Sequence, residues 1–380
     1  MKRNLIILSG LSIIIFGCAF LQGQPRVYTI DELRAIYSSG DVSKWPKPNL
    51  DDEAKKDFKD IGYLGRPSYP ADNPFNDDKE KLGKTLFFDP RLSASKQIAC
   101  ASCHDPELGW GDGRRLAYGH DRQNGKRNAM TIINSAFYKK LFWDGRAKSL
   151  EDQSGFPVQD HLEMNQDLTS MVKNVSDIKG YAPMFEKAFG DKDVTLDKIQ
   201  KAIATFERSI VSTNSRFDSF VKGNPKALKD NEIEGMHLFR TKARCINCHN
   251  TPLFSDNLFH NDGQALLGSK MQDLGRYNVT KNLADVGKFR TPSLRETSIT
   301  GPWMHHGNFP SLKDVIEFYN FGNPIATPKN AVIPDSLLIA KKSPMLQKLN
   351  LTLEEQEDLE AFLRAISTRV SKINAPTLPQ

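Results

Sequence analysis

CASCH at residues 100–104 and CINCH at residues 245–249 decide the fold of this 380-residue chain. Each segment has two cysteines separated by two residues and a histidine directly after the second cysteine. Four of the five cysteines belong to these two motifs, and the fifth, Cys18, follows an N-terminal apolar run. No cysteine is therefore left over to form a disulfide.

The C-x-x-C-H spacing is typical of covalent attachment of a c-type haem. The two cysteines form thioether bonds to the haem, and the adjacent histidine supplies the proximal nitrogen to the iron. A zinc site, or a redox-active cysteine pair followed by a chance histidine, is the alternative, but two complete copies argue against coincidence. The sequence predicts two haems c, attached through Cys100, Cys103, Cys245 and Cys248, with His104 and His249 as proximal ligands.

Composition excludes several classes of protein. The chain is 39% apolar and 26% charged, which excludes collagen, a coiled coil and wholesale disorder. Its formal charge of +6 is spread along the chain without a basic block, so we expect no nucleic-acid partner. The length is sufficient for two domains.

The N-terminus, MKRNLIILSGLSIIIFGCAF, has the layout of a secretory signal, with a basic start and an apolar centre. We expect residues 1–17 to be a signal peptide and the mature protein to be periplasmic. The segment ending in Cys18 resembles the lipobox of bacterial lipoproteins, although Phe16 departs from the usual small residue. Lipidation at Cys18 would tether the protein to a membrane surface, whereas an ordinary signal peptide would leave it free.

Hydrophobic periodicity predicts a mainly α fold with two domains, each carrying one motif. Residues 18–80 are interrupted by prolines and are expected to form an N-terminal arm, wrapped on the body or left loose. The domains are expected at 81–225 and 226–375, because GNPKALKDN breaks the pattern near residue 225, and the C-terminal part is expected to be able to pack back on the first domain. Apolar spacing and capping residues predict helices near 31–37, 196–210, 231–241, 311–320 and 352–366.

Three further stretches carry a family resemblance. They are KLGKTLFFDPRLSASKQIACASCH (81–104), GHDRQNGKRNAMTIINSAFYKKLFWDGRAKSLEDQSGFPVQDHLEM (119–164) and KFRTPSLRETSITGPWMHHG (288–307). Together with the second motif they resemble the bacterial di-haem cytochrome c peroxidases and their MauG-type relatives, over roughly residues 80–370. The resemblance implies two cytochrome c-like domains, with a peroxidatic haem on the first motif and an electron-transfer haem on the second.

The resemblance also implies residue roles. Trp143 matches the tryptophan between the haems, Glu163 matches the distal glutamate, and Gln153 matches the glutamine beside it. A carboxylate in a haem pocket suits peroxide cleavage, because it takes a proton from one oxygen and delivers it to the other. His120 matches the histidine that caps the resting peroxidatic iron in many members. Considered alone, Trp143 is equally consistent with a buried core residue at a domain contact, and the two roles are compatible. A lone loop histidine such as His120 is usually solvated or hydrogen-bonded.

The resemblance implies a calcium site between the haems as well. Asn128, Thr300 and Pro302 match its protein ligands, and waters would complete the shell. Carbonyl and amide oxygens are donors that calcium prefers.

One position departs from the peroxidase pattern. The electron-transfer haem of the peroxidases takes a methionine as its sixth ligand, but the matching residue here is Tyr319, as in the MauG-type branch. Met304 and Met271 are alternative ligands, and a core tyrosine is the alternative role for Tyr319. On a helix Tyr319 shares one face with three apolar residues, Leu312, Val315 and Ile316.

Three functions compete. The leading one is an exported peroxidase that reduces hydrogen peroxide to water with electrons from a small redox protein, a cytochrome c or a cupredoxin. The second is a MauG-type enzyme that uses peroxide to oxidise residues of a partner protein. The third is a non-catalytic di-haem electron carrier, against which Glu163 and Gln153 argue. Members of the family are commonly dimers, so the resemblance also suggests a homodimer.

Overall fold

The computed structural model describes residues 27–212, 214–325, 328, 330–338, 340–368 and 373–380. The expected signal peptide and Cys18 lie outside the described residues. The described part is mainly helical and contains one short pair of antiparallel strands, which confirms the predicted fold class. No helix in this part of the chain has the length and apolar character needed to cross a membrane.

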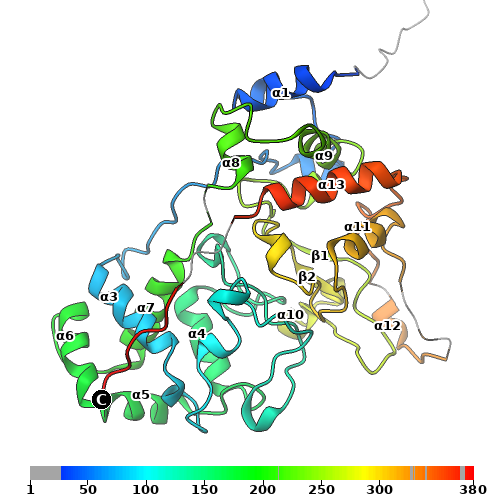
Figure 1. Cartoon of the computed structure of the whole chain (residues 1–380). Helices are drawn as coiled ribbons and strands as arrows, with labels where there is room; N and C mark the ends of the chain where they lie inside the picture. Colours follow the sequence, from blue (N-terminus) through cyan, green and yellow to red (C-terminus); the bar gives the residue numbers. More distant parts are fainter. Residues whose placement is uncertain (1–26, 213, 326–327, 329, 339, 369–372) are drawn as a thin grey trace, which may run out of the picture.

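Helices form both ends of the molecule, and long loops fill the middle (Figure 1). The helices are α1 (Ile30–Ser38), α2 (Asp52–Lys55), α3 (Asp77–Phe87), α4 (Leu150–Gln159), α5 (Leu168–Ser176), α6 (Ala182–Phe189), α7 (Leu196–Ser209), α8 (Arg216–Val221), α9 (Asp230–Arg240), α10 (Tyr277–Thr280), α11 (Leu312–Asn320), α12 (Asp335–Leu338) and α13 (Leu353–Ala365). The strands are β1 (Phe259–Asn261) and β2 (Lys288–Arg290), with Phe259 opposite Arg290.

Two hydrophobic cores share one plan. In the first, α3 precedes the first motif and crosses α7, and in the second, α9 precedes the second motif and crosses α13. Each crossing has a glycine at the point of closest approach. The Cα of Gly83 faces the Ala202 carbonyl, and the Cα of Gly235 faces the Asp358 carbonyl, so closely that a Cβ would overlap either oxygen. The two haem-binding segments are thus held beside equivalent pairs of helices.

The N-terminal arm packs on the second core. Its apolar side chains Leu33, Tyr37, Trp45 and Ile61 are buried among residues of α9 and α13. The arm also covers the second motif, because Asn247 Oδ1 accepts a hydrogen bond from the Asp51 amide. The sequence left open whether the arm is wrapped or loose, and from residue 27 onward it is wrapped.

The five predicted helices are confirmed as α1, α7, α9, α11 and α13. Local chemistry explains their starts. Thr352 and Glu355 form a reciprocal capping box at α13, and Ser311 caps the Asp314 amide at α11. The strands β1 and β2 were not predicted, because three-residue strands leave no periodic signal in the sequence.

The C-terminal tail, residues 373–380, lies against the first core. The Gly180 amide donates to the Gln380 carbonyl at 2.8 Å, and Arg91 donates to the Pro379 carbonyl at 3.0 Å. Ile373 packs against the apolar residues of the same core. The tail therefore returns from the second motif's half of the molecule to the first (Figure 1).

Candidate functional site

Each motif opens into its own pocket. The first-motif pocket is a cavity of about 910 Å³ lined by Cys103, His104 and the loops that follow them. The second-motif pocket is lined by Cys245, Cys248 and His249, mostly among apolar side chains. Seven residues line both pockets and form their common wall: Asn128, Met130, Thr131, Tyr138, Trp143, Arg290 and His305.

The proximal histidines are held in the same way. His104 Nδ1 lies 3.2 Å from the Trp110 carbonyl, and His249 Nδ1 lies 3.1 Å from the Phe254 carbonyl. A backbone carbonyl can only accept, so Nδ1 carries the proton and Nε2 remains as the metal-binding nitrogen. Burial lowers the pKa of both imidazoles, which keeps them neutral. Both rings are therefore prepared as ligands.

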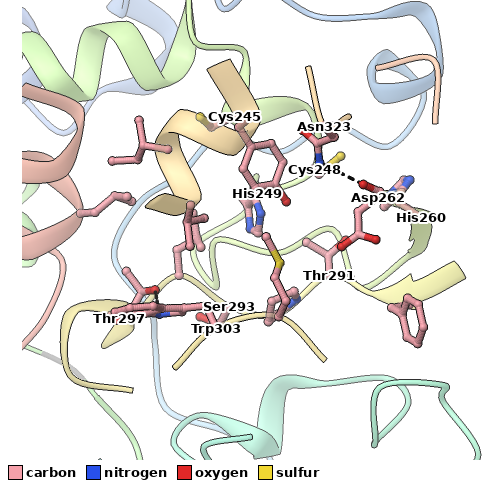
Figure 2. Close-up of a pocket in the computed structure, with 18 of the residues that line it drawn as sticks. Cys245, Cys248, His249, His260, Asp262, Thr291, Ser293, Thr297, Trp303 and Asn323 are labelled. Atoms are coloured by element: carbon pink, nitrogen blue, oxygen red, sulfur yellow. Dashed lines mark hydrogen bonds between the residues drawn. The ribbon is translucent and has the colours of Figure 1, made fainter. Parts of the chain in front are cut away.

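The residues present fit two covalent haems. In each motif a pair of cysteines lies beside a histidine whose Nε2 is available for iron, and no disulfide joins the described cysteines. Figure 2 shows Cys245, Cys248 and His249 together at one side of the second-motif pocket. Two cationic side chains suited to haem carboxylates, Arg115 and Lys126, line the first-motif pocket.

The distal residues predicted for the first haem do converge. Glu163, Gln153 and Trp143 all line the first-motif pocket, although they come from a loop, from α4 and from a turn. Burial, with a smaller effect of the nearby Asp160 carboxylate, raises the pKa of Glu163 to about 7. A carboxyl group with this pKa can both accept and donate a proton near neutral pH.

His120 is placed differently from these three. Its side chain is not among the described residues that line the first-motif pocket, and its Nε2 lies 3.4 Å from an Asp121 carboxylate oxygen. Its backbone amide donates to the Glu163 carbonyl at 2.7 Å. In this structure His120 thus positions the segment carrying Glu163, and its role as a cap on the iron stays a prediction.

The second-motif pocket contains two of the three candidate sixth ligands. Tyr319, from α11, and Met304 both line it, whereas Met271 lines the first-motif pocket. Burial and the Asp262 carboxylate raise the pKa of Tyr319, so the protein alone keeps this phenol protonated. Met345, which no sequence pattern marks as a ligand, also lines this pocket.

The common wall contains the predicted bridging residues. Trp143 Nε1 donates to the Asn128 carbonyl at 3.1 Å, and its ring meets the His305 ring edge-on at 6.3 Å. Asn128, Thr300 and Pro302 all line the second-motif pocket, so the three residues assigned to calcium lie around one space.

Sequence reasoning missed His305. This side chain is 2% exposed, stacks on Phe289 at 3.6 Å between ring centroids, and has no hydrogen-bond partner for either nitrogen in the described part of the chain. The segment GPWMHHG (301–307) carries part of the family resemblance, but the resemblance implies no role for its first histidine. A buried histidine whose two nitrogens lack a partner among the described residues is an exception among buried polar groups, and its position in the common wall makes it a candidate functional residue.

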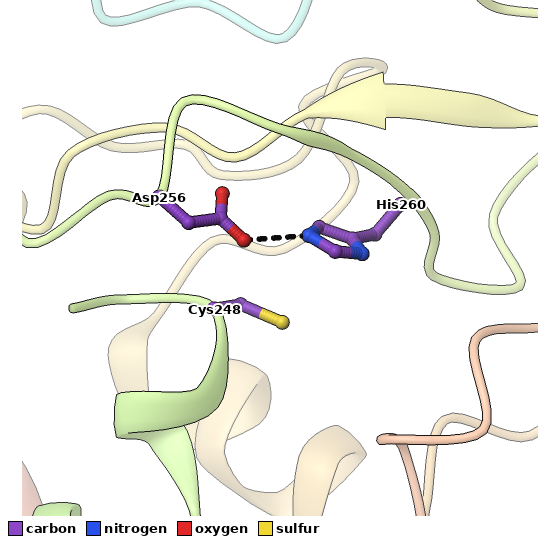
Figure 3. A group of neighbouring side chains, drawn as sticks. All are labelled: Cys248, Asp256 and His260. Carbon is purple, nitrogen blue, oxygen red and sulfur yellow. Dashed lines mark hydrogen bonds and ion pairs between the residues drawn. The ribbon is translucent and has the colours of Figure 1, made fainter. Parts of the chain in front are cut away.

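A further cluster lies beside the second motif. His260 Nε2 and Asp256 Oδ2 are 2.7 Å apart, close to Cys248 (Figure 3). Burial by itself lowers the pKa of His260, but the hydrogen bond to Asp256 acts in the opposite direction. The pKa of His260 is raised to about 10 as a result. The three groups have metal-binding spacing, but attachment of haem would convert the Cys248 thiol into a thioether. We therefore assign the cluster to the haem site.

The comparisons with known proteins agree with this geometry. Residues 77–226 match the family described as di-haem cytochrome c peroxidase. The methylamine utilization protein MauG of Methylophilus methylotrophus is 38% identical over 315 residues, covering 82% of this chain and 89% of MauG. The cytochrome-c peroxidase IdrP1 of Pseudomonas sp. strain SCT is 37% identical over 340 residues, covering 82% and 86% of the two chains.

A solved structure gives the same result for the fold. The crystal structure of a MauG-like protein associated with microbial copper homeostasis has a TM-score of 0.73 to this chain, at 30% sequence identity. The match covers 81% of this chain and 94% of that one. Because the similarity spans most of both sequences and includes both haem-binding motifs, the chain belongs to the di-haem cytochrome c peroxidase and MauG family.

Proposed function

We propose that this protein reduces hydrogen peroxide to water with electrons from a small redox protein, a cytochrome c or a cupredoxin. The observation that carries the proposal is Glu163, a carboxyl group with a pKa of about 7 in the pocket that also contains His104. The overall reaction consumes one peroxide, two electrons and two protons and gives two waters. An electron carrier with two closed haems has no use for this carboxyl group.

The residues of the first-motif pocket divide the work. The haem would supply an iron that binds peroxide and accepts electrons, held by His104 and the thioethers of Cys100 and Cys103. Glu163 takes the proton from the peroxide oxygen nearer the iron and delivers it to the farther oxygen, which leaves as water. Gln153, on α4 in the same pocket, offers an amide to orient the peroxide.

The common wall connects the two sites. Trp143 lines both pockets, and we propose that it carries electrons from the second site to the first. We propose that Asn128, Thr300 and Pro302 hold a calcium ion in this wall with the help of water. A cation here would fix the wall that both pockets share.

The secretory-signal layout of the N-terminal sequence supports a proposal on cellular localisation. We propose export to the periplasm by the segment 1–17, with a lipid tether at Cys18. Two domains, 81–225 and 226–375, would each hold one haem, with the arm 18–80 joined to the second. A homodimer is part of the same proposal.

A second candidate function is oxidation of a partner protein, which the resemblance to the MauG-type branch implies. The observation that favours it is Tyr319 in the second-motif pocket. Phenolate ligation favours ferric over ferrous iron, which makes the second haem a poor acceptor from ordinary cytochrome c. Such a site would instead share oxidising equivalents with its neighbour.

The test combines haem counting with turnover. The purified protein should keep two haems per chain through acid-acetone extraction, and a Cys100→Ala/Cys103→Ala variant should lose reaction with peroxide. Steady oxidation of reduced cytochrome c or cupredoxin by peroxide supports the peroxidase. Reaction with peroxide without turnover of either donor supports the MauG-type function, and no reaction at all contradicts both.

A further inference from the structure

The N-terminal arm places a buried tyrosine against a histidine of α9. The oxygen of Tyr37, whose side chain is 0% exposed, lies 2.8 Å from His237 Nδ1. Arg240 Nη1 donates to the same oxygen at 3.0 Å. Because arginine is only a donor, the phenolic hydrogen is free to point at His237, and Tyr37 donates to Nδ1.

The surroundings keep both groups neutral. Burial raises the pKa of Tyr37 to about 12, and burial together with Arg240 lowers the pKa of His237 to about 4. The charge of Arg240 is balanced by a two-pronged ion pair with the Asp60 carboxylate. A neutral phenol therefore faces a neutral base, to which its proton can move when the ring loses an electron.

The pair lies one helix away from the second-motif pocket. His237 and Arg240 face the arm, while Phe239 on the same helix lines the pocket. An α-helix with its side chains is about 10–12 Å wide, so about one helix width lies between the Tyr37–His237 pair and the second-motif pocket. Figure 1 shows α1 lying over α9 at this end of the molecule.

Aromatic rings continue from Tyr37 in two directions. Trp45, also buried, meets Tyr37 edge-on at 5.2 Å between centroids. Tyr28, which is partly exposed, meets His237 edge-on at 5.9 Å. The cluster thus extends from the helix that borders the haem pocket to the surface of the arm.

We propose that Tyr37 and His237 form a redox-active site that takes up oxidising equivalents from the second haem when no electron donor is bound. The proposal rests on the proposed function, since peroxide supplies the oxidant. Tyr37 gives one electron to the oxidised haem, and its phenolic proton passes to His237 Nδ1. The products are a neutral tyrosyl radical and an imidazolium. The step is reversed when one electron from the donor protein reaches the radical and the proton returns from His237.

A purely structural role makes a different prediction. If the network only clamps the arm to α9, removing the phenolic oxygen affects stability and nothing else. The two roles are separated by electron paramagnetic resonance of the haem-loaded full chain, frozen soon after addition of peroxide without a donor. Peroxide remaining in the same sample is measured in parallel.

We expect a tyrosyl signal in the wild type that narrows when the protein contains ring-deuterated tyrosine. Tyr37→Phe should remove it, because the ring remains but the transferable proton does not. Tyr181→Phe is the matched control, since Tyr181 is equally buried but donates to Asp89 in the first core. The signal should survive in that variant.

A second variant covers failure of Tyr37→Phe to fold. His237→Gln keeps a hydrogen-bond acceptor for Tyr37 but no group that can hold the proton, so most of the signal should be lost. An unchanged signal in Tyr37→Phe or His237→Gln overturns the proposal. Peroxide consumption without any tyrosyl signal in the wild type also overturns it and leaves the proposed function intact, whereas absence of peroxide consumption contradicts both.

Discussion

At Glu163 the proposed chemistry depends on one exchangeable proton. Glu163→Gln keeps the size and the hydrogen-bonding capacity of the side chain but cannot cycle a proton between the two peroxide oxygens. We expect peroxide turnover to fall by about 10²–10⁴-fold, the range typical of general acid–base groups, with both haem spectra unchanged. Turnover within a factor of two of the wild type would remove Glu163 from the mechanism.

The pH profile gives an independent check on the same residue. Burial raises the pKa of Glu163 to about 7, so its carboxylate form, which accepts the first proton, is depleted below that pH. The value of kcat/KM for peroxide should therefore rise with pH and level off above a midpoint near 7. In Glu163→Gln this rise should disappear.

Tyr319 is the residue that separates the two candidate functions. If its phenolate ligates the second iron, the ferric protein should lack the weak near-infrared band of methionine–histidine haem. Tyr319→Met should create that band, raise the reduction potential of the second haem and improve turnover with cytochrome c. The reason is that a sulfur ligand favours the electron-rich ferrous state. The measurement is near-infrared spectroscopy with a redox titration of each variant.

The control for this substitution is Met304→Leu, because Met304 lines the same pocket. If Tyr319 is the ligand, Met304→Leu should leave the spectrum unchanged. If Tyr319 only packs in the pocket, Tyr319→Met should leave the spectrum unchanged and alter stability by less than about 1.5 kcal/mol. A methionine–histidine band in the wild type contradicts tyrosine ligation.

Among the elements, the crossing of α9 and α13 is the most sensitive contact of the second core. A Cβ on Gly235 would overlap the Asp358 carbonyl and press on Phe362. Alanine normally stabilises a helix relative to glycine by about 1 kcal/mol. Gly235→Ala should instead lower the free energy of unfolding by about 1–3 kcal/mol, because the helices must separate.

Gly65→Ala is the matched control in chemical denaturation, since no atom lies within 4 Å of a Cβ built at that position. It should change the free energy of unfolding by less than about 0.5 kcal/mol. Equal effects of the two substitutions would show that the crossing is not tightly packed.

At the scale of the whole molecule, an ion pair joins the two halves beside the first-motif pocket. Arg127 binds Asp273 through both Nε and Nη2, at 2.6 and 2.9 Å. Burial by itself raises the pKa of Asp273, but the Arg127 guanidinium lowers it by more. The pKa of Asp273 therefore lies below its usual value. The pair therefore stabilises the folded state above about pH 4 and loses this effect as the pH falls through the folded-state pKa.

Asp273→Asn should lower the free energy of unfolding by about 1.5–3 kcal/mol at neutral pH, the range for hydrogen bonds to charged groups. The deficit should shrink in acid, where the wild type loses the same charge. Thermal unfolding at pH 7 and pH 3 measures both quantities. Asp52 forms an exposed ion pair with Lys55, so Asp52→Asn should have the same stability as the wild type. A similar loss of stability in Asp52→Asn would show that the effect of Asp273→Asn does not come from the buried ion pair with Arg127.

The sequence by itself determined the features that depend on a few specific residues close together in the chain. The two haem-binding motifs are contiguous, so their spacing alone identifies the cofactor and its attachment. The starts of α11 and α13 follow from Ser311 and Thr352, because a cap and the amide that it binds are three residues apart. The family resemblance indicated that Glu163, Gln153 and Trp143 would lie at the first haem. It did not indicate how deeply these side chains are buried or how burial changes the pKa of Glu163.

The tertiary structure decided what depends on residues far apart in the chain. The pKa of Glu163 is raised because surrounding segments bury it. His305 lies between the two pockets because they share a wall. Tyr37 contacts His237 because the arm folds back onto a helix 200 residues further along the chain. Such contacts form only when apolar surface is buried, and burial is a property of the whole packed chain. No local pattern encodes them, because the unfolded chain brings these residues together only rarely.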